Sequence, residues 1–273
     1  MKIGIFDSGM GGLTVLARCL EAVELKGWSP TFVYFADSDY APYGERTIQE
    51  VQILTRQAVK FLIEEEQVDI IVVACNTATS LAIEQLRSEF SIPLIGIEPA
   101  IKPAMEHSDI DKRILVTATP LMIESQRLKD RILELGVEDR VDRISLPGLV
   151  HLAEDESLNW QERQIEAKKY LNQMIPTEGD ENYGSVVLGC THFPIFLTAY
   201  QEVFSERGLT NVYFADGAEG VARQLIASMM DVKSYMLLED KKPSIRFYQS
   251  GRRVRGSKEK RFEDLLKEIQ EQI

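Results

Sequence analysis

Two cysteines in this chain stand in matching surroundings. Cys75 lies in the segment IIVVACNT (70–77), and Cys190 lies in VVLGCTH (186–192). Each follows a run of apolar residues typical of a buried strand and precedes a region that we expect to be helical. Backbone N–H groups at a helix N-terminus favour a thiolate over a thiol. The two segments therefore predict two thiols that can accept or donate a proton.

Three other roles are open to the cysteines: core packing, zinc binding and disulfide formation. A lone free cysteine is often a small buried hydrophobe, and Cys19, inside the first expected helix, is assigned to the core. A zinc site is disfavoured because the chain has no CxxC pair and only one histidine close to either thiol. A disulfide is disfavoured because an odd, small number of cysteines is typical of a reducing cytoplasm. We expect no metal.

A glycine-rich segment, FDSGMGGLT (6–14), also follows an expected strand. It does not have the GxGxxG spacing of a dinucleotide loop, and Asp7 would face a pyrophosphate, so nucleotide binding is the weaker interpretation. Glycines let the backbone approach a small ligand, whose carboxylate Ser8 and backbone N–H groups could hold. Asp7 could accept from an ammonium group or orient a thiol proton, and the N-cap of the next helix is its alternative role.

Composition excludes several classes of protein. The chain has 273 residues and a net charge of −12, which disfavours binding to phosphate backbones, so we expect no nucleic-acid partner. The first apolar run is too short for a secretory signal, and no stretch approaches the roughly 18 apolar residues of a membrane span. We therefore expect a cytoplasmic protein that acts on a small molecule and has no membrane partner.

Short apolar runs alternate with helical spacing along the chain, which predicts parallel α/β structure. Strands are expected at 2–6, 31–36, 69–74, 93–97, 113–117, 141–146, 185–188 and 212–215. Helices are expected at 14–25, 47–66, 78–89, 123–135, 161–174, 194–207 and 219–230. Ligands of such sheets bind beyond the carboxyl ends of the strands, which is where both cysteines and the glycine-rich segment fall.

The pattern restarts near Arg113 and so predicts two similar lobes, each a mostly parallel sheet flanked by helices. We expect an N-terminal α/β lobe over 1–97 and a second over 98–212. A C-terminal segment over 213–273 should return a helix to the first lobe. Within that segment, residues 250–260 are interpreted as a loop, and the residues after them as an amphipathic helix.

Six segments, in this order and spacing, resemble the glutamate racemases of the aspartate/glutamate racemase family: FDSGMGGLT, ADSDYAPYGER, ACNTAT, IGIEPAIKPA, GCTHFP and ADGAEGVA. The resemblance covers residues 1 to about 230. It implies two α/β lobes with the active site in the cleft between them. It also implies catalysis without pyridoxal phosphate, metal or any other cofactor, in a homodimer.

The resemblance assigns roles to individual residues. It implies that Cys75 and Cys190 are the two bases, that Asp7 assists the first thiol, and that His192, with Glu154 behind it, assists the second. The substrate-binding positions that it implies are Asp7, Ser8, Pro42, Tyr43, Gly44, Asn76, Thr77, Thr117, Thr119, Thr191 and His192. By itself, PYGER (42–46) would be an ordinary loop before a helix capped by Thr47.

The implied reaction is the interconversion of L- and D-glutamate, which supplies D-glutamate for peptidoglycan and so for cell shape. Inversion removes the α-proton from one face and returns one to the other, and two thiols on opposite faces suit that task. In the family, the counterpart of Cys75 takes the proton from the D-isomer and that of Cys190 from the L-isomer. Two alternatives stay open. One is a racemase of aspartate or another amino acid, since Met122 stands where the family usually has threonine. The other is a non-catalytic regulatory relative.

Overall fold

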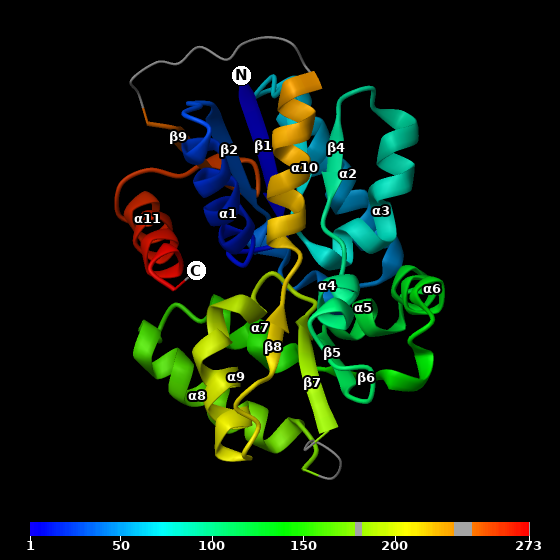
Figure 1. The fold of residues 1–273 in the computed structure, drawn as a ribbon. Helices are drawn as coiled ribbons and strands as arrows, with labels where there is room; N and C mark the ends of the chain where they lie inside the picture. The colour runs from blue at the N-terminus through cyan, green and yellow to red at the C-terminus, as the bar shows by residue number, and fades with distance from the viewer. Residues whose placement is uncertain (178–181, 232–241, 273) are drawn as a thin grey trace. The chain divides into compact units, whose positions relative to one another are not determined.

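The computed structural model describes residues 1–177, 182–231 and 242–272, which form two compact α/β units (Figure 1). The first unit comprises Met1–Glu98 and Ala218–Ile273, and the second comprises Pro99–Gly217. Each unit contains its own mostly parallel sheet flanked by helices, so the predicted fold class is confirmed.

The first unit is built on a six-stranded sheet with the order β10-β9-β2-β1-β3-β4. Its strands are β1 (Lys2–Asp7), β2 (Thr31–Ala36), β3 (Ile70–Val73), β4 (Leu94–Gly96), β9 (Ser244–Gln249) and β10 (Arg252–Arg253). All neighbours pair in parallel except β9 and β10. Every residue of β3 is buried, as expected of a parallel strand that is covered on both faces.

Helices from both ends of the first unit's sequence cover this sheet. They are α1 (Leu13–Leu25), α2 (Ile48–Glu64), α3 (Asn76–Glu89), α10 (Ala218–Asp231) and α11 (Ser257–Gln270). Helix α1 packs against α10 and α11, and α2 packs against α3. A capping box formed by Thr47 and Glu50 fixes the start of α2. The C-terminal segment thus adds helices as well as two strands to the first unit.

The second unit contains four parallel strands with the order β6-β5-β7-β8. They are β5 (Arg113–Ala118), β6 (Val141–Ser145), β7 (Tyr183–Leu188) and β8 (Tyr213–Ala215). This order matches β2-β1-β3-β4 of the first unit, so the two units repeat one topology. Because β8 belongs to this sheet, the unit extends to Gly217, beyond the boundary at 212 that the sequence suggested.

The helices of the second unit differ in several places from the sequence prediction. They are α4 (Ile101–Glu106), α5 (Pro120–Glu124), α6 (Gln126–Leu135), α7 (Pro147–Glu154), α8 (Trp160–Met174) and α9 (Leu197–Glu206). The single helix predicted over 123–135 is wrong, because the chain is extended at Ser125 and the helix divides into α5 and α6. The Ser125 hydroxyl accepts from Leu128 N at 3.2 Å and so caps α6.

The C-terminal tail contains the largest departure from the prediction. Residues 250–260 were expected to be a loop, but they include β10 and the start of α11, and β9 was not expected at all. Strand β9 has only one fully buried residue, Phe247, and it carries polar and charged side chains. It lies second from the edge of the sheet, between β2 and the two-residue β10, and it lacks the apolar run by which the other strands were identified.

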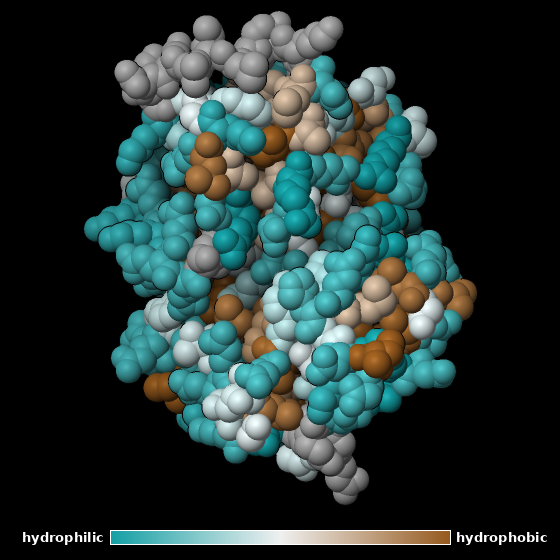
Figure 2. Space-filling view, viewed as in Figure 1, coloured by the Kyte–Doolittle hydropathy of each residue, from teal (hydrophilic) through white to brown (hydrophobic). Residues whose placement is uncertain are grey.

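Apolar side chains fill the interior of each unit. In the second unit, Met122 and Leu128 belong to the buried cluster between the helices and the sheet and are 1 % and 0 % exposed. On the face shown in Figure 2, most of the surface is hydrophilic and apolar side chains form small separate areas. None of the described helices is long and apolar enough to cross a membrane.

Candidate functional site

The strand order of each unit creates a place where polar residues gather. In the first unit β1 lies between β2 and β3, and in the second β5 lies between β6 and β7. Successive connections therefore leave the central strand on opposite sides, and the carboxyl ends of the two middle strands form a switch point where ligands bind. Asp7 ends β1 and Cys75 follows β3, while Thr117 lies near the end of β5 and Cys190 follows β7.

Cys75 is held at the N-terminus of a long helix. It is the N-cap of α3, and its Sγ accepts from the backbone N of Ala78 at 3.4 Å. The same sulfur lies 3.5 Å from Ser8 Oγ, and the residue is 5 % exposed. The N–H group and the positive end of the helix dipole both favour the thiolate. The predicted position of Cys75 at a helix N-terminus is therefore confirmed.

Asp7 reaches the same switch point from β1. It is fully buried, and its Oδ2 accepts from Gly9 N at 3.1 Å. Helix α1 has Gly12 as its N-cap, so the alternative role of Asp7 as a helix cap is wrong. A Cβ on Gly12 would lie only 2.5 Å from Asp7 Cβ, and this close approach requires glycine at that position.

The loop after β2 brings Tyr43 and its neighbours to this half-site. Tyr43 is 1 % exposed, and its hydroxyl donates to Asp37 Oδ2 at 2.6 Å. Burial raises the pKa of Tyr43 far above its usual value, and the charges of Asp37, Cys75 and Asp7 raise this pKa further. The tyrosine therefore keeps its proton. Gly44 is buried beside it and Pro42 is partly buried, and this turn packs against α3.

Sequence reasoning missed Asp37. Burial raises the pKa of its carboxyl, against the hydrogen bonds from Tyr43 and Ser250, and its backbone N donates to Asp7 O at 2.9 Å. Its position could have revealed it, because Asp37 directly follows the end of β2 just as Asp7 stands at the end of β1. Asn76 and Thr77, the remaining predicted residues of this unit, are buried in the first turn of α3 directly after Cys75.

Cys190 has different partners. Its Sγ lies 3.6 Å from Nδ1 of His192, and Nε2 of His192 lies 2.7 Å from Glu154 Oε1. The helix predicted to start near Cys190 does not do so. The short 3-10 helix η5 (Phe193–Phe196) comes first, and α9 begins at Leu197. Because no long helix begins at this cysteine, His192 and not a helix terminus is its polar neighbour.

Electrostatics at His192 favour its charged form. Burial of the imidazole lowers its pKa, but the hydrogen bonds with Cys190 and Glu154 outweigh burial and raise the pKa well above its usual value. A protonated imidazole beside the sulfur stabilises a thiolate. Glu154, at the end of α7, keeps its side chain partly exposed while it orients the ring.

Three of the four threonines predicted as substrate contacts are buried in the second unit. Thr117 donates to Val187 O at 3.0 Å and accepts from the hydroxyl of Tyr200 at 3.1 Å, so its side chain ties β5 to β7 and α9. Thr119 is the N-cap of α5, and Thr191 follows Cys190. Sequence reasoning missed Tyr200, because a tyrosine on an apolar helix face is indistinguishable from ordinary core.

The structure thus groups the predicted residues into two half-sites. The first half-site, in the first unit, holds Asp7, Ser8, Pro42, Tyr43, Gly44, Cys75, Asn76 and Thr77. The second half-site, in the second unit, holds Thr117, Thr119, Glu154, Cys190, Thr191 and His192.

Comparison with known proteins identifies the family of the chain. A family model described as Asp/Glu/Hydantoin racemase matches residues 3–225. The chain belongs to this racemase family.

Individual relatives of this racemase cover its whole length. It is 37 % identical over 275 residues to glutamate racemase 2 of Bacillus subtilis, a match that covers 99 % of this chain and 98 % of the relative. Among solved structures, glutamate racemase from Aquifex pyrophilus is 30 % identical with a TM-score of 0.67 and covers 98 % of this chain and 95 % of its own. Glutamate racemase from Francisella tularensis in complex with D-glutamate is 25 % identical with a TM-score of 0.73, covering 99 % and 93 %.

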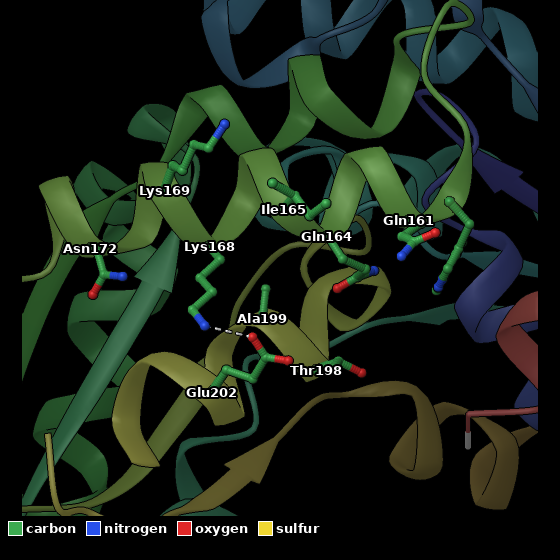
Figure 3. Close-up of a pocket in the computed structure, with 10 residues that line it drawn as sticks. Gln161, Gln164, Ile165, Lys168, Lys169, Asn172, Thr198, Ala199 and Glu202 are labelled. Carbon is green, nitrogen blue, oxygen red and sulfur yellow. Dashed lines mark ion pairs between the residues drawn. The ribbon is translucent and has the colours of Figure 1, made fainter. Parts of the chain in front are cut away.

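Two further features of the racemase lie apart from the half-sites. Cys19 is fully buried in α1, and burial raises the pKa of its thiol to about 12, so it remains a neutral core residue as predicted. A groove of about 540 Å³ lies between α8 and α9, where Lys168 Nζ pairs with Glu202 Oε2 at 2.8 Å (Figure 3). No predicted site residue lines this groove.

Across residues 1–177, 182–231 and 242–272, no cluster of three or more His, Cys, Asp or Glu side chains is placed to hold a metal ion. The polar residues around each thiol are instead hydrogen-bond donors and acceptors in the geometry given above.

Proposed function

We propose that this chain is a glutamate racemase that interconverts L- and D-glutamate with two thiols and without a cofactor. Relatives named glutamate racemase match nearly its full length, and Cys75 and Cys190 both lie within residues 3–225, the range that the family model matches. One observation carries the mechanism. Each of two sheets with the same strand order has a buried cysteine with its own polar partner at its switch point.

The proposed chemistry uses the two thiols as a matched acid and base. One starts as a thiolate and takes the α-proton, and the other starts as a thiol and gives a proton to the opposite face of the α-carbon. Turnover leaves their protonation states exchanged, so the reverse reaction begins from the product state. In this proposal Cys75 takes the proton from D-glutamate, and Cys190 takes it from L-glutamate.

Each half-site offers a way to hold its thiolate near neutral pH. For Cys75 it is the N-terminus of α3, where Ala78 N donates to the sulfur, and as a thiol the same group donates to Ser8 Oγ. For Cys190 it is the His192–Glu154 pair. General acid–base catalysis is most efficient when the pKa of the group lies near the working pH, and each sulfur has a polar neighbour that can stabilise its charged form.

A carbanion at the α-carbon needs electrostatic stabilisation, because an amino acid provides no electron sink of its own. We propose that hydroxyl and amide groups of Ser8, Asn76, Thr77 and Thr191, together with helix N-terminal N–H groups, bind the α-carboxylate. These donors would stabilise the charge that develops as the proton leaves. Tyr43 and Gly44 would complete the substrate contacts of the first half-site.

The proposal extends to the cell. A protein that depends on two free thiols is suited to a reducing cytoplasm, and D-glutamate made there would enter peptidoglycan synthesis. We also propose a homodimer, and measurement of the mass of the purified protein by light scattering tests it.

Exchange of the α-proton with deuterated water tests the proposed reaction. Purified protein that has been dialysed against chelator and contains no pyridoxal phosphate should convert either isomer of glutamate into the racemic mixture. During this conversion deuterium should enter the α-position. L- and D-aspartate serve as the comparison substrates and should react much more slowly.

The outcome is decisive in each direction. If glutamate neither loses optical activity nor takes up deuterium, the protein is not a glutamate racemase. If aspartate reacts faster than glutamate, the reaction type stands and the substrate is wrong. The Cys19→Ala variant is the matched control, since it removes a thiol that lies outside both half-sites, and it should racemise glutamate at the wild-type rate.

A further inference from the structure

The charged tail of the chain forms a tight hairpin at the edge of the first unit's sheet. Strand β9 pairs in parallel with β2, and β10 turns back on β9 with Arg252 opposite Gln249. The two residues between them, Ser250 and Gly251, have φ angles of 44° and 79°. Positive φ at both central residues is characteristic of a type I′ turn, the turn that matches the twist of a two-stranded hairpin.

The tip of this hairpin contacts the loop that follows β2. Ser250 N donates to Ala36 O at 2.8 Å, and the Ser250 hydroxyl accepts from Asp39 N at 3.1 Å. Burial raises the pKa of the Asp37 carboxyl, and the nearby Ser250 hydroxyl works against that rise. Arg252 forms an ion pair with Asp39. The tail therefore contacts both carboxylate residues at the start of this loop, Asp37 and Asp39.

That loop leads directly to the first half-site. Asp37 accepts from the hydroxyl of Tyr43 at 2.6 Å, and its backbone N donates to Asp7 O. The Tyr43 ring packs against Phe6 with 6.1 Å between centroids, and the charge of Cys75 contributes to the raised pKa of this tyrosine. A short series of contacts thus links Ser250 through Asp37 and Tyr43 to the surroundings of the Cys75 thiol.

We propose that the hairpin at residues 249–253 is a positioning element of the Cys75 half-site, in which Ser250 and Arg252 hold the loop at residues 37–46. This inference rests on the proposed function for its kinetic consequence. Neither residue touches the thiol. Arg252 acts through Asp39, and Ser250 acts through Asp39 and the adjacent Asp37, whose buried carboxylate accepts from the hydroxyl of Tyr43.

The two contacts should contribute unequally. Arg252 is mostly exposed, with 68 % of its side chain accessible, and a surface ion pair of this kind adds little. Ser250 forms two hydrogen bonds with backbone groups, one from its own N to Ala36 O and one from Asp39 N to its hydroxyl, and it lies beside the buried carboxylate of Asp37. We therefore expect Ser250 to dominate the effect.

Substitution at the hairpin tests the proposal. Ser250→Ala should lower kcat/KM for glutamate by about tenfold, mainly through a higher KM, and Arg252→Ala by about twofold. Ser250→Gly should lower kcat/KM as much as Ser250→Ala, although glycine relieves the positive φ. Arg255→Ala is the matched control, because it removes an exposed arginine from the same tail and should leave the kinetics unchanged.

Two readouts separate positioning from a general loss of stability. Amide hydrogen exchange at residues 37–46 should become faster in Ser250→Ala and not in Arg255→Ala. The acid limb of the kcat/KM profile should move to higher pH, because the Ser250 hydrogen bond lowers the pKa of Asp37. The other charged or titratable groups that influence Asp37 are Tyr43, Asp39 and Arg46, and none of these changes.

The result that would overturn the proposal is unchanged exchange at residues 37–46 together with kinetics within twofold of wild type in Ser250→Ala. Equal losses in Ser250→Ala and Arg255→Ala would overturn it as well. If wild-type protein does not racemise glutamate, the proposed function fails, yet the exchange measurement still shows whether the hairpin holds the loop.

Discussion

The two thiols occupy the same place in two copies of one topology, yet different groups surround their sulfur atoms. Cys75 depends on backbone, because α3 starts at this residue and an amide N–H points to the sulfur. Cys190 depends on a side chain, because the chain turns through η5 and the imidazole of His192 lies beside the sulfur. A helix terminus has no titration of its own, whereas an imidazole does. The second half-site should therefore respond to pH through His192, whereas the first half-site has no such titratable partner in the N-terminus of α3.

The largest expected effect comes from removing either sulfur. Cys75→Ser and Cys190→Ser should each lower racemisation by roughly a thousandfold, since positioned acid–base groups contribute about 10²–10⁴ and serine is a much weaker acid. The measurement is the rate of loss of optical activity by circular dichroism. Near wild-type activity in both variants would end the two-thiol mechanism. Activity in one alone would show that a single base serves both faces.

Loss of the carboxylate behind His192 should be the next largest effect and should affect only the second half-site. Glu154→Gln removes a partner that raises the imidazole pKa, so His192 should lose its proton at lower pH. Because the protonated ring stabilises the Cys190 thiolate, activity should decline on the basic side as the ring deprotonates. The basic limb of kcat/KM should therefore move to lower pH. At neutral pH the rate should decrease by about tenfold, as expected for a charged hydrogen bond.

Kinetics in the two directions sharpen this test. L- and D-glutamate have equal free energies, so kcat/KM must be the same in both directions whatever the substitution. Any asymmetry between the thiols must appear in kcat and KM separately. In Glu154→Gln these two constants should change more for the isomer whose proton Cys190 removes. Equal changes for both isomers would contradict the assignment of Cys190 to one face.

Ser8 is the corresponding side chain in the first half-site, and its effect should be smaller. Ser8→Ala removes a hydroxyl 3.5 Å from the Cys75 sulfur but leaves the N–H of Ala78 in place. We expect kcat/KM to decrease by about three- to tenfold, with no movement of the basic limb. The pH profiles of Ser8→Ala and Glu154→Gln, measured side by side, give the comparison. A shifted basic limb in Ser8→Ala would mean that the two half-sites are coupled.

Sequence reasoning succeeded where a pattern is local. The strand before Cys75 is an uninterrupted apolar run and the strand before Cys190 ends in one, and the turn after β1 has a glycine where the Asp7 side chain leaves no space for a Cβ. These features depend on neighbouring residues only, so composition and spacing reveal them. The strand at 31–36 was predicted with its observed bounds for the same reason.

The remainder depends on contacts between residues far apart in the sequence. Asp37 gains its importance from Ser250, and Thr117 has its hydroxyl bound by Tyr200. Strand β9 is stable because it pairs with β2, although its own residues carry no strong strand pattern. The helix predicted over 194–207 starts as the 3-10 helix η5, where a proline and aromatic residues form a tighter turn before α9.

The smallest expected effect on activity concerns Met122, which the sequence placed among possible specificity residues. Its side chain is 1 % exposed in the core of the second unit, and its sulfur lies 3.8 Å from Ser125 Oγ. Met122→Thr should leave the preference for glutamate over aspartate within twofold of wild type. The same change should reduce the free energy of unfolding by about 2–4 kcal/mol, because it creates a cavity and buries a hydroxyl.

Chemical denaturation of Met122→Thr beside Met122→Leu separates the two consequences. Leucine keeps most of the volume and adds no polar group, so it should cost less than about 1.5 kcal/mol. A change of substrate preference in the threonine variant, at full occupancy of the folded state, would contradict a purely structural role. It would also place Met122 among the residues that discriminate between substrates by the length of their side chain. If preference stays constant while stability falls, specificity belongs to the polar residues around the two sulfurs.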